Sequence, residues 1–378
     1  MPHASLRSFS ESFADLPDPR IERTQKHNLM EIIAIAIFAV VSGADSFTEM
    51  EEYGNAKLAW LRGFLGLPNG IPSHDTFGRV LAMLDPERFA ASLHEWVAES
   101  VGLVGAQQIA IDGKTLRRAH DRTQGKKALH LLSAWATESQ ISLGQLKVEG
   151  HENEIVALPA LIEQVVMPGA VVSIDAMGCQ REVARAITDA GGDYLLALKG
   201  NQPELHASVR RLFAEEQEED VAAAILTHAY TVDGGHGRVE RRECWAAAGD
   251  ELIGYLDPDG RWPGLQSVVK VKTRRITGDS PQSETRYYLS SLPPDAARFN
   301  TLIRTHWSIE NQLHWVLDVV FDEDQSRVRS GYADQNLAAL RRFVVGLLSK
   351  QTSPRMSKRA KRLRAGWDDD FLIQLLTQ

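Results

Sequence analysis

The chain has 378 residues and a formal net charge of −8, with 43% hydrophobic and 24% charged residues. This length allows two or three domains, and this composition excludes a disordered or fibrous protein. The longest apolar run has ten residues, about half of what a membrane span needs, and only two cysteines occur. The sequence therefore predicts a cytoplasmic protein without a membrane partner, disulfides or a zinc site.

The first hundred residues have the spacing of apolar side chains that is typical of helices. Helices are expected over residues 29–41, 47–64, 74–84 and 88–103, with Ser73 as the N-cap of the third. No strand pattern occurs here, so residues 1–105 are predicted to form an all-helical domain. Two roles stay open for it: recognition of DNA by a helix in the major groove, or dimerisation and packing.

The pattern changes near Gln107 to short apolar runs that alternate with helices. These runs predict strands over residues 108–115, 129–137, 141–148, 170–175 and 194–198. Helices are expected over 154–166 and 181–190, the second closed by Gly191 and Gly192. Three consecutive strands followed by alternating helix and strand predict an α/β fold, a mixed sheet with helices packed on it.

Strand patterns return between residues 225 and 292, and we interpret them as a β-rich insertion rather than a continuation of the first sheet. Long helices are then expected over 299–320 and 336–350. The residues after 350 form a basic segment, because residues 350–364 contain seven basic side chains and no acid. Such separated charge blocks allow the chain to bind a polyanion despite its net negative charge.

Three acidic residues occupy positions that suit phosphoryl-transfer chemistry. Asp112 is assigned to the end of the first strand of the sheet, Asp175 to the end of a buried strand, and Glu310 lies within a predicted helix. Carboxylates that converge at strand ends are the hard oxygen ligands of Mg²⁺, and a pair of such ions supports in-line displacement at phosphorus. The alternative is that the two Asp residues only cap turns. Asp318, two turns after Glu310, is the second candidate for the third acid.

Several longer motifs identify a family that the chain resembles. They are IAIDGKTLRRA, NEIVALPAL, VVSIDAMGCQ, GGDYLLALKGNQ and THWSIENQLHWVLDVVFDED, with LPNGIPSHDTFGRV and LDPERF before them and KRLRAGWDDDFL after them. Together they resemble the H-repeat-associated DDE transposases of bacterial insertion sequences, over essentially the whole chain. The resemblance implies a ribonuclease-H-like catalytic domain over residues 106–350, an insertion at about 225–292, and a basic segment over 351–378.

The resemblance also implies a function. Asp112, Asp175 and Glu310 would be the acidic triad, holding Mg²⁺, with Mn²⁺ as an alternative. The protein would bind double-stranded DNA at the element's terminal repeats, cut it and join it to target DNA as a homodimer, associated with the nucleoid when bound. Two alternatives are an inactive remnant that only occupies the element ends, and a ribonuclease-H-like nuclease that cuts without joining.

Basic and aromatic residues near the acids and at the C-terminus are the predicted DNA contacts. Related transposases often carry Arg four residues before the catalytic Glu and Lys seven after it, where this chain has His306 and Leu317. Arg304 is the expected replacement cation. The alternative is a solvated charged face, or a core position for the tryptophan. The full set of predicted contacts is Lys114, Arg117, Arg118, His236, Arg238, Arg304, His306, Trp307, Asn311, Lys358, Arg359, Lys361 and Arg362.

Overall fold

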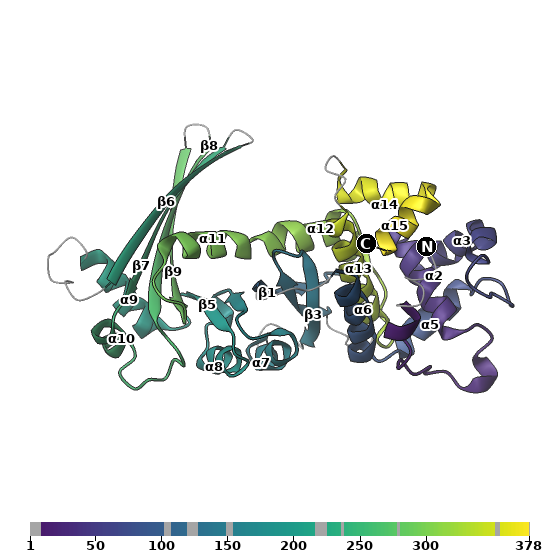
Figure 1. Ribbon diagram of the computed structural model, residues 1–378, viewed down its shortest axis with the longest axis horizontal. Helices are drawn as coiled ribbons and strands as arrows, with labels where there is room; N and C mark the ends of the chain where they lie inside the picture. The colour runs from purple at the N-terminus through teal and green to yellow at the C-terminus, as the bar shows by residue number, and fades with distance from the viewer. Residues whose placement is uncertain are drawn as a thin grey trace.

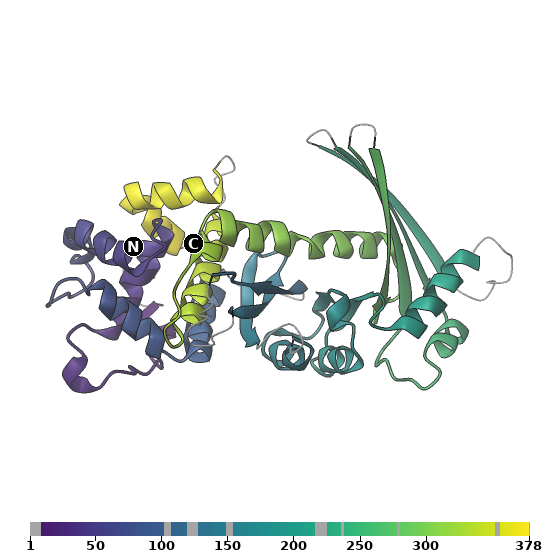
Figure 2. The same cartoon turned by 180° about the vertical axis from the view of Figure 1, so that it is seen from behind.

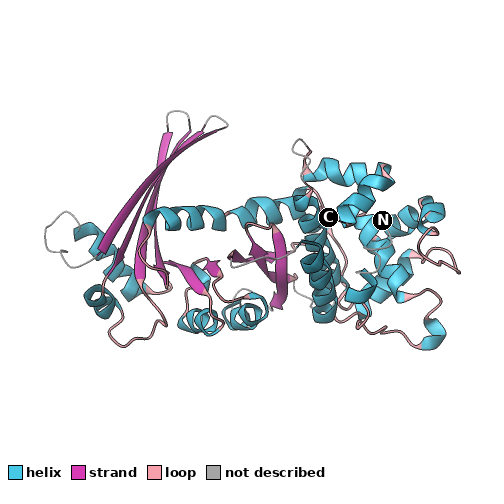
Figure 3. Cartoon of the chain, viewed as in Figure 1, coloured by secondary structure: helices cyan, strands magenta, loops and turns pink. Residues whose placement is uncertain are grey.

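The computed structural model is elongated, with helices at one end, a helix-covered sheet in the middle and a long twisted ribbon of strands at the other (Figure 1). Figure 3 shows the same division by colour, with the magenta strands confined to the middle and the far end. The structure describes residues 9–101, 107–118, 128–148, 154–215, 225–235, 238–277, 280–351 and 356–377. Within these ranges, no helix combines the length and the apolar character needed to cross a membrane.

The N-terminal region is helical, as predicted. After the short turn η1 (Glu22–Thr24) it contains α2 (Leu29–Val41), α3 (Phe47–Ala56), α4 (Leu58–Leu61), α5 (His74–Met83) and α6 (Pro86–Val101). The predicted helix over 47–64 is divided near Lys57 into α3 and α4. Ser46 and Glu49 form a capping box at the start of α3. Helix α2 is buried along nearly all of its length because its apolar residues lie on every side.

The first five strands form a ribonuclease-H-like sheet in the order β3-β2-β1-β4-β5. They are β1 (Gln108–Thr115), β2 (His130–Ala136), β3 (Ile141–Val148), β4 (Val171–Ile174) and β5 (Asp193–Leu198). Strands β1, β2 and β3 pair antiparallel, whereas β4 is parallel to both β1 and β5. Helices α7 (Glu154–Val165) and α8 (Arg181–Asp189) pack on one face. These elements confirm the predicted mixed sheet with flanking helices.

The strands of the predicted insertion continue the same sheet, which corrects the expectation that they would stand apart from it. They are β6 (Ile225–Gly235), β7 (Arg238–Ala248), β8 (Ser267–Thr277) and β9 (Ser280–Ser290), with α9 (Pro203–Glu215) and α10 (Asp250–Leu256) beside them. Strand β9 pairs antiparallel with β5, so nine strands form one sheet in the described part of the chain. The physical reason is that β5 would otherwise be an edge strand with unpaired backbone groups.

A long helical segment crosses the face of the sheet opposite α7 and α8 (Figure 1). It consists of α11 (Ala296–His306), the π-helical turn η4 (Glu310–His314) and α12 (Trp315–Val319). The short turn η5 (Glu323–Gln325) then leads toward α13 (Ala333–Lys350). The predicted helix over 299–320 is thus interrupted by one π-helical turn, a feature that often marks functional sites.

The C-terminal helices α14 (Lys358–Trp367) and α15 (Asp369–Leu376) lie against the N-terminal helices in both views (Figures 1 and 2). One hydrophobic core extends from Phe9 to Leu376 and includes Ile309 and Leu313 beside the sheet. Helix α13 lies inside this core and is buried on every side. The predicted division of the chain at residues 105 and 350 stays a prediction, and the shared core joins elements from both sides of it.

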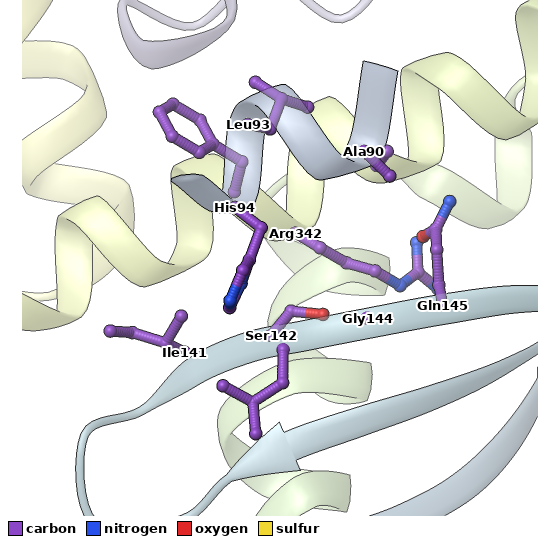
Figure 4. A pocket seen from close by; sticks show the side chains of 11 residues that line it. Ala90, Leu93, His94, Ile141, Ser142, Gly144, Gln145 and Arg342 are labelled. Atoms are coloured by element: carbon purple, nitrogen blue, oxygen red, sulfur yellow. The ribbon is translucent and has the colours of Figure 1, made fainter. Parts of the chain in front are cut away.

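Figure 4 shows a small cavity where side chains of α6, β3 and α13 meet, with Leu93, Ser142 and Arg342 among them. Its volume is about 40 Å³, enough for water but far too small for a nucleotide.

Candidate metal centre

The adjacent parallel strands β1 and β4 bring two of the predicted acids to one edge of the sheet. Asp112 lies within β1, directly after the last residue that pairs with β4, and Asp175 follows β4 directly. Strand β1 itself continues to Thr115, paired with β2. Side chains alternate along β1: Ile109 and Ile111 face the core under α7 and α8, so Asp112 projects to the opposite face, where α12 lies. Asp175 caps the next turn, since its carboxylate accepts a hydrogen bond of 3.0 Å from the backbone nitrogen of Met177.

Glu310 reaches this edge from the π-helical turn and brings a histidine with it. One ligand atom each from Asp112, Glu310 and His314 lie within 4.8 Å of one another. Nδ1 of His314 is 3.4 Å from Oδ2 of Asp112 and 3.8 Å from Oε2 of Glu310. Asp175 is not one of this group of three, although its charge acts on Asp112. The structure therefore joins two of the three predicted acids directly and adds His314.

Sequence reasoning did not assign His314, although a signal for it existed. Residues four apart on a helix share a face, so the sequence alone places Glu310 and His314 on the same side of the predicted helix. Their neighbours Ile309 and Leu313 are buried in the hydrophobic core, which fixes the turn against the sheet. His314 is only 5% exposed, whereas the Glu310 side chain is 52% exposed. The group is thus walled in on the histidine side and open to solvent on the glutamate side.

Burial and charge repulsion disfavour ionisation at the centre of the group. Burial raises the pKa of Asp112 to about 6; the charge of His314 opposes this rise, and the charges of Glu310 and Asp175 add to it. The nearby imidazole of His314, by contrast, lowers the pKa of Glu310. Carboxylates held together in this way are stabilised by a bound cation. The donor set of carboxylate oxygens and one imidazole fits a divalent metal ion.

Lys114 is enclosed by carboxylates and does not fit its predicted contact with a phosphate. It is 8% exposed, and its Nζ lies 2.6 Å from Oδ1 of Asp318, 3.3 Å from Oδ1 of Asp324 and 3.7 Å from Oε2 of Glu323. Asp318, the second candidate for the third acid, is therefore paired with Lys114. Lys114 therefore ties β1 to the segment that follows α12.

The other two cations predicted beside Asp112 are both exposed. Arg117 is 83% exposed, with its Nε 3.4 Å from Oδ2 of Asp324. The carbonyl of Arg118 accepts a hydrogen bond of 3.4 Å from Nη2 of Arg329. Their predicted contact with DNA stays a prediction.

His306 is a buried core residue, which corrects its predicted contact with DNA. Its Nδ1 lies 3.0 Å from Oγ of Ser173 on β4, and burial lowers the pKa of His306 to about 4. It is therefore neutral near pH 7 and faces the sheet. Its neighbour Trp307 is 38% exposed, with the guanidinium of Arg286 4.6 Å from its ring centre. Trp307 is thus partly exposed, and its predicted contact with DNA stays a prediction.

A groove of about 510 Å³ opens between α11 and the ribbon of strands, and Glu310 and Asn311 lie at one end of it. Asn311 is exposed. Four arginines line the groove: Arg242, Arg275, Arg286 and Arg304. Only Arg304 was predicted, and it forms an ion pair with Asp233 on β6. The other three lie on strands β7, β8 and β9. The pairing of these strands brings the three arginines together, and their spacing in the sequence does not reveal it.

Carboxylates inside the groove hold these arginines in place. Glu240 contacts Nη2 of Arg242 at 2.6 Å and Nε of Arg275 at 2.9 Å. Glu284 lies 2.8 Å from Nε of Arg286. Nη1 of Arg242 is buried and has no hydrogen-bond partner in the described part of the chain. The groove is thus a preorganised set of guanidinium groups that begins beside Glu310. Of the predicted hairpin tip, His236 lies outside the described residues, and Arg238 pairs through its backbone with Gly235 and Thr277.

The basic C-terminal segment is largely structural, which corrects the predicted DNA contacts of Lys361 and Arg362. Nζ of Lys361 donates to the carbonyls of Leu348 and Gln351 at 2.8 and 2.6 Å and so caps the end of α13. The guanidinium of Arg362 lies 2.9 Å from Oδ1 of Asp45.

Arg362 also packs over the ring of Phe321 at 4.0 Å and donates to the carbonyl of Val40, at the end of α2. Lys361 and Arg362 are 6% and 4% exposed. Lys358 is half-buried, and burial lowers its pKa, whereas Arg359 is exposed. Of the four predicted contacts in this segment, Arg359 is the most accessible to a ligand.

Two family models and several relatives match the chain. The family model described as "Transposase DDE domain" matches residues 104–345, and the model "DDE_Tnp_1-associated" matches residues 10–97. The H repeat-associated putative transposase YhhI of Escherichia coli K12 is 34% identical over 381 residues, 98% of each chain. The putative transposase YncI of Escherichia coli O157:H7 is 34% identical over 376 residues, 98% of this chain and 95% of its own.

Two further matches are an uncharacterized protein and a solved structure. An uncharacterized protein in the dhlA 3′ region of Xanthobacter autotrophicus is 45% identical over 285 residues, 75% of this chain and 94% of its own. Among solved structures, the piggyBac transposase in a synaptic complex with hairpin DNA aligns over 98% of this chain and 80% of its own, with 11% identity and a TM-score of 0.45.

Proposed function

Because the chain belongs to the DDE transposase family, we propose that it cuts DNA at the ends of an insertion sequence and joins those ends to target DNA. The observation that carries this proposal is the group formed by Asp112, Glu310 and His314 where the pairing of β1 with β4 ends, with Asp175 directly after β4. Residues from three distant parts of the chain meet there, which suits a shared cation better than a set of turn caps.

We propose Asp112, Asp175 and Glu310 as the residues that hold the cation, and Mg²⁺ as the cation, with Mn²⁺ as the alternative. When bound, a divalent cation offsets negative charge on the reacting phosphate and favours ionisation of the attacking oxygen. The chain's own residues supply position and electrostatics, which dominate in phosphoryl transfer. Glu310 is the most exposed of the ligands, so DNA would approach from its side.

The arginine groove gives this approach a direction. It begins at Glu310 and Asn311 and continues between α11 and the ribbon, where Arg275 and Arg286 present guanidinium groups. Such groups bind phosphates in a bidentate manner and fix the register of the nucleic acid. The exposed ring of Trp307 offers a stacking surface at the same place. We propose that this groove holds the DNA strand next to the reacting phosphate, with Arg117, Arg118 and Arg359 as further contacts.

The proposed partners are double-stranded DNA and a second copy of the chain. Two element ends have to be held together for joining, and a homodimer provides one centre for each. The proposed place of action is the bacterial cytoplasm, at the nucleoid when DNA is bound.

The direct test uses the full chain and linear DNA that carries the inverted repeats found beside its reading frame, together with a target plasmid. With Mg²⁺ or Mn²⁺ we expect strand cleavage at the repeat and joined products on a gel. EDTA should abolish both reactions, because the carboxylates alone do not replace the cation. Cleavage without joining would indicate a nuclease, and binding without cleavage would indicate an inactive remnant that occupies the ends. Full cleavage in EDTA would contradict the proposed mechanism.

The groove predicts a specific dependence of DNA binding on salt. Replacing Arg275 and Arg286 by Gln should reduce the slope of log affinity against log salt by about 0.9 for each phosphate that is no longer neutralised, so by about 1.8 for both. Arg261→Gln is the matched control, since Arg261 is exposed, pairs with Asp259 and does not line the groove. Fluorescence anisotropy with labelled DNA at several salt concentrations measures the slopes. Equal slopes for the double variant and the control would exclude the groove as the DNA path.

A further inference from the structure

We infer that His314 is a direct ligand of the bound cation and that its nitrogen shifts the preference of the centre from Mg²⁺ toward Mn²⁺. This inference rests on the proposed function, because it concerns the same centre. It adds a residue and a metal selectivity that the acidic triad alone does not imply.

The imidazole of His314 lies between the two carboxylates. His314 is 5% exposed, and Nδ1 points at two carboxylates, 3.4 Å from Oδ2 of Asp112 and 3.8 Å from Oε2 of Glu310. Both separations exceed the 2.7–3.2 Å of a good hydrogen bond. The ring is therefore not committed to either carboxylate, although it is held where both can reach the same ion.

The distances among the three donor atoms are close to those around a single metal ion. The three donor atoms lie within 4.8 Å of one another. Adjacent ligands of an octahedral ion with bonds of 2.0–2.2 Å lie about 3 Å apart, so a small closure brings all three donors into one coordination shell. The ring's other nitrogen, Nε2, is buried and has no hydrogen-bond partner among the described residues. No described contact therefore competes for the ring or fixes it in a different role.

The surrounding carboxylates keep the nearby lysine away from the group. Lys114 is the nearby lysine on the same face of β1, and Asp318 and Asp324 hold its ammonium group. It is therefore not free to move between Asp112 and Glu310. His314 is placed in their midst instead, and a neutral imidazole coordinates a cation without adding charge.

The chemistry of the nitrogen donor sets the selectivity. Mg²⁺ takes oxygen ligands almost exclusively, whereas first-row transition metals also accept imidazole. One nitrogen donor among carboxylates therefore increases affinity for Mn²⁺ relative to Mg²⁺. Replacing it by an oxygen donor should reverse that change.

The experiment measures metal binding by the full chain without DNA, so that activity is not the readout. Mn²⁺ is added to excess protein, and electron spin echo envelope modulation detects the coupling of a coordinated ¹⁴N nucleus. Calorimetry then gives Kd values for Mn²⁺ and Mg²⁺. The test variant is His314→Gln, which offers an amide oxygen in place of the nitrogen, and circular dichroism checks its fold. His228→Gln, at an exposed histidine on β6, is the matched control for adventitious binding.

We expect a ¹⁴N signal in the wild-type protein and in His228→Gln, and its loss in His314→Gln. The Kd for Mn²⁺ should rise by at least about 10-fold in His314→Gln, with a smaller change for Mg²⁺. The Asp112→Asn variant distinguishes a failure of the proposed role of His314 from a failure of the proposed metal centre. If Asp112→Asn weakens Mn²⁺ binding but the wild type shows no ¹⁴N coupling, the acidic centre stands and the role of His314 is wrong. If Asp112→Asn leaves Mn²⁺ binding unchanged, the proposed metal centre fails, and the inference fails with it.

Discussion

Asp112→Asn is expected to lower the rate of DNA cleavage by more than about 100-fold, because even residues that only support a metal ligand cost 10–100-fold when they are replaced. The amide has nearly the same shape but lacks the charge that attracts the cation. The variant should remain folded. Burial and the charges of Glu310 and Asp175 act against the ionised form of Asp112, so removing that charge should leave the free energy of unfolding equal or higher.

Cleavage assays and urea unfolding, run on the same preparation, check both halves of this prediction. Asp189→Asn is the matched control, since Asp189 is an exposed aspartate at the end of α8. It should leave the cleavage rate unchanged. A variant at Asp112 that is inactive because it unfolds would not support the assignment, whereas an active variant would exclude Asp112 as a ligand.

Glu323→Ala is expected to lower the free energy of unfolding by about 3–5 kcal/mol, the cost of removing one partner of a buried ion pair. Glu323 is completely buried, and its Oε1 lies 3.0 Å from Nη1 of Arg342, which is 1% exposed. Its other oxygen faces Lys114 at 3.7 Å. The alanine variant leaves two buried cations with less compensation, close to the strand that carries Asp112.

Urea unfolding gives the size of this effect. Asp259→Ala breaks the exposed pair with Arg261 and should cost less than about 1 kcal/mol. The double variant Glu323→Leu with Arg342→Met removes both charges of the pair and should recover part of the stability. A decrease of less than about 1 kcal/mol in Glu323→Ala would mean that the buried network contributes little to stability.

Local sequence patterns were sufficient for the central sheet. The strands β1 and β3 begin and end where their apolar residues predict, and the acids at the strand ends followed from the same patterns. The proposed centre depends on these elements and on the helical segment that carries Glu310. Its carboxylates were therefore visible in the sequence, together with the family resemblance that selects Glu310 over Asp318.

Contacts between distant residues decided the rest. The pairing of Leu198 with Tyr287 joins β5 to β9, and no local pattern encodes it. Lys361 and Arg362 look like part of a solvated basic face because no acid occurs between residues 350 and 364. Their partners are backbone carbonyls and Asp45, more than 300 residues away from Arg362. Charge counts along a chain thus do not distinguish a buried cap from a surface that binds DNA.

Because the nine strands form one continuous sheet, the fold fixes the distance between the arginine groove and the acidic centre. Three arginines of the groove, Arg242, Arg275 and Arg286, lie on strands of the same sheet that contains Asp112. The strands between them are hydrogen-bonded in the order β1, β4, β5, β9, β8 and β7. In the proposed complex, this fixed spacing requires the DNA to adapt its shape to the protein. The proposed cleavage is then expected to be fastest at element ends whose base steps deform easily between the arginine groove and the acidic centre.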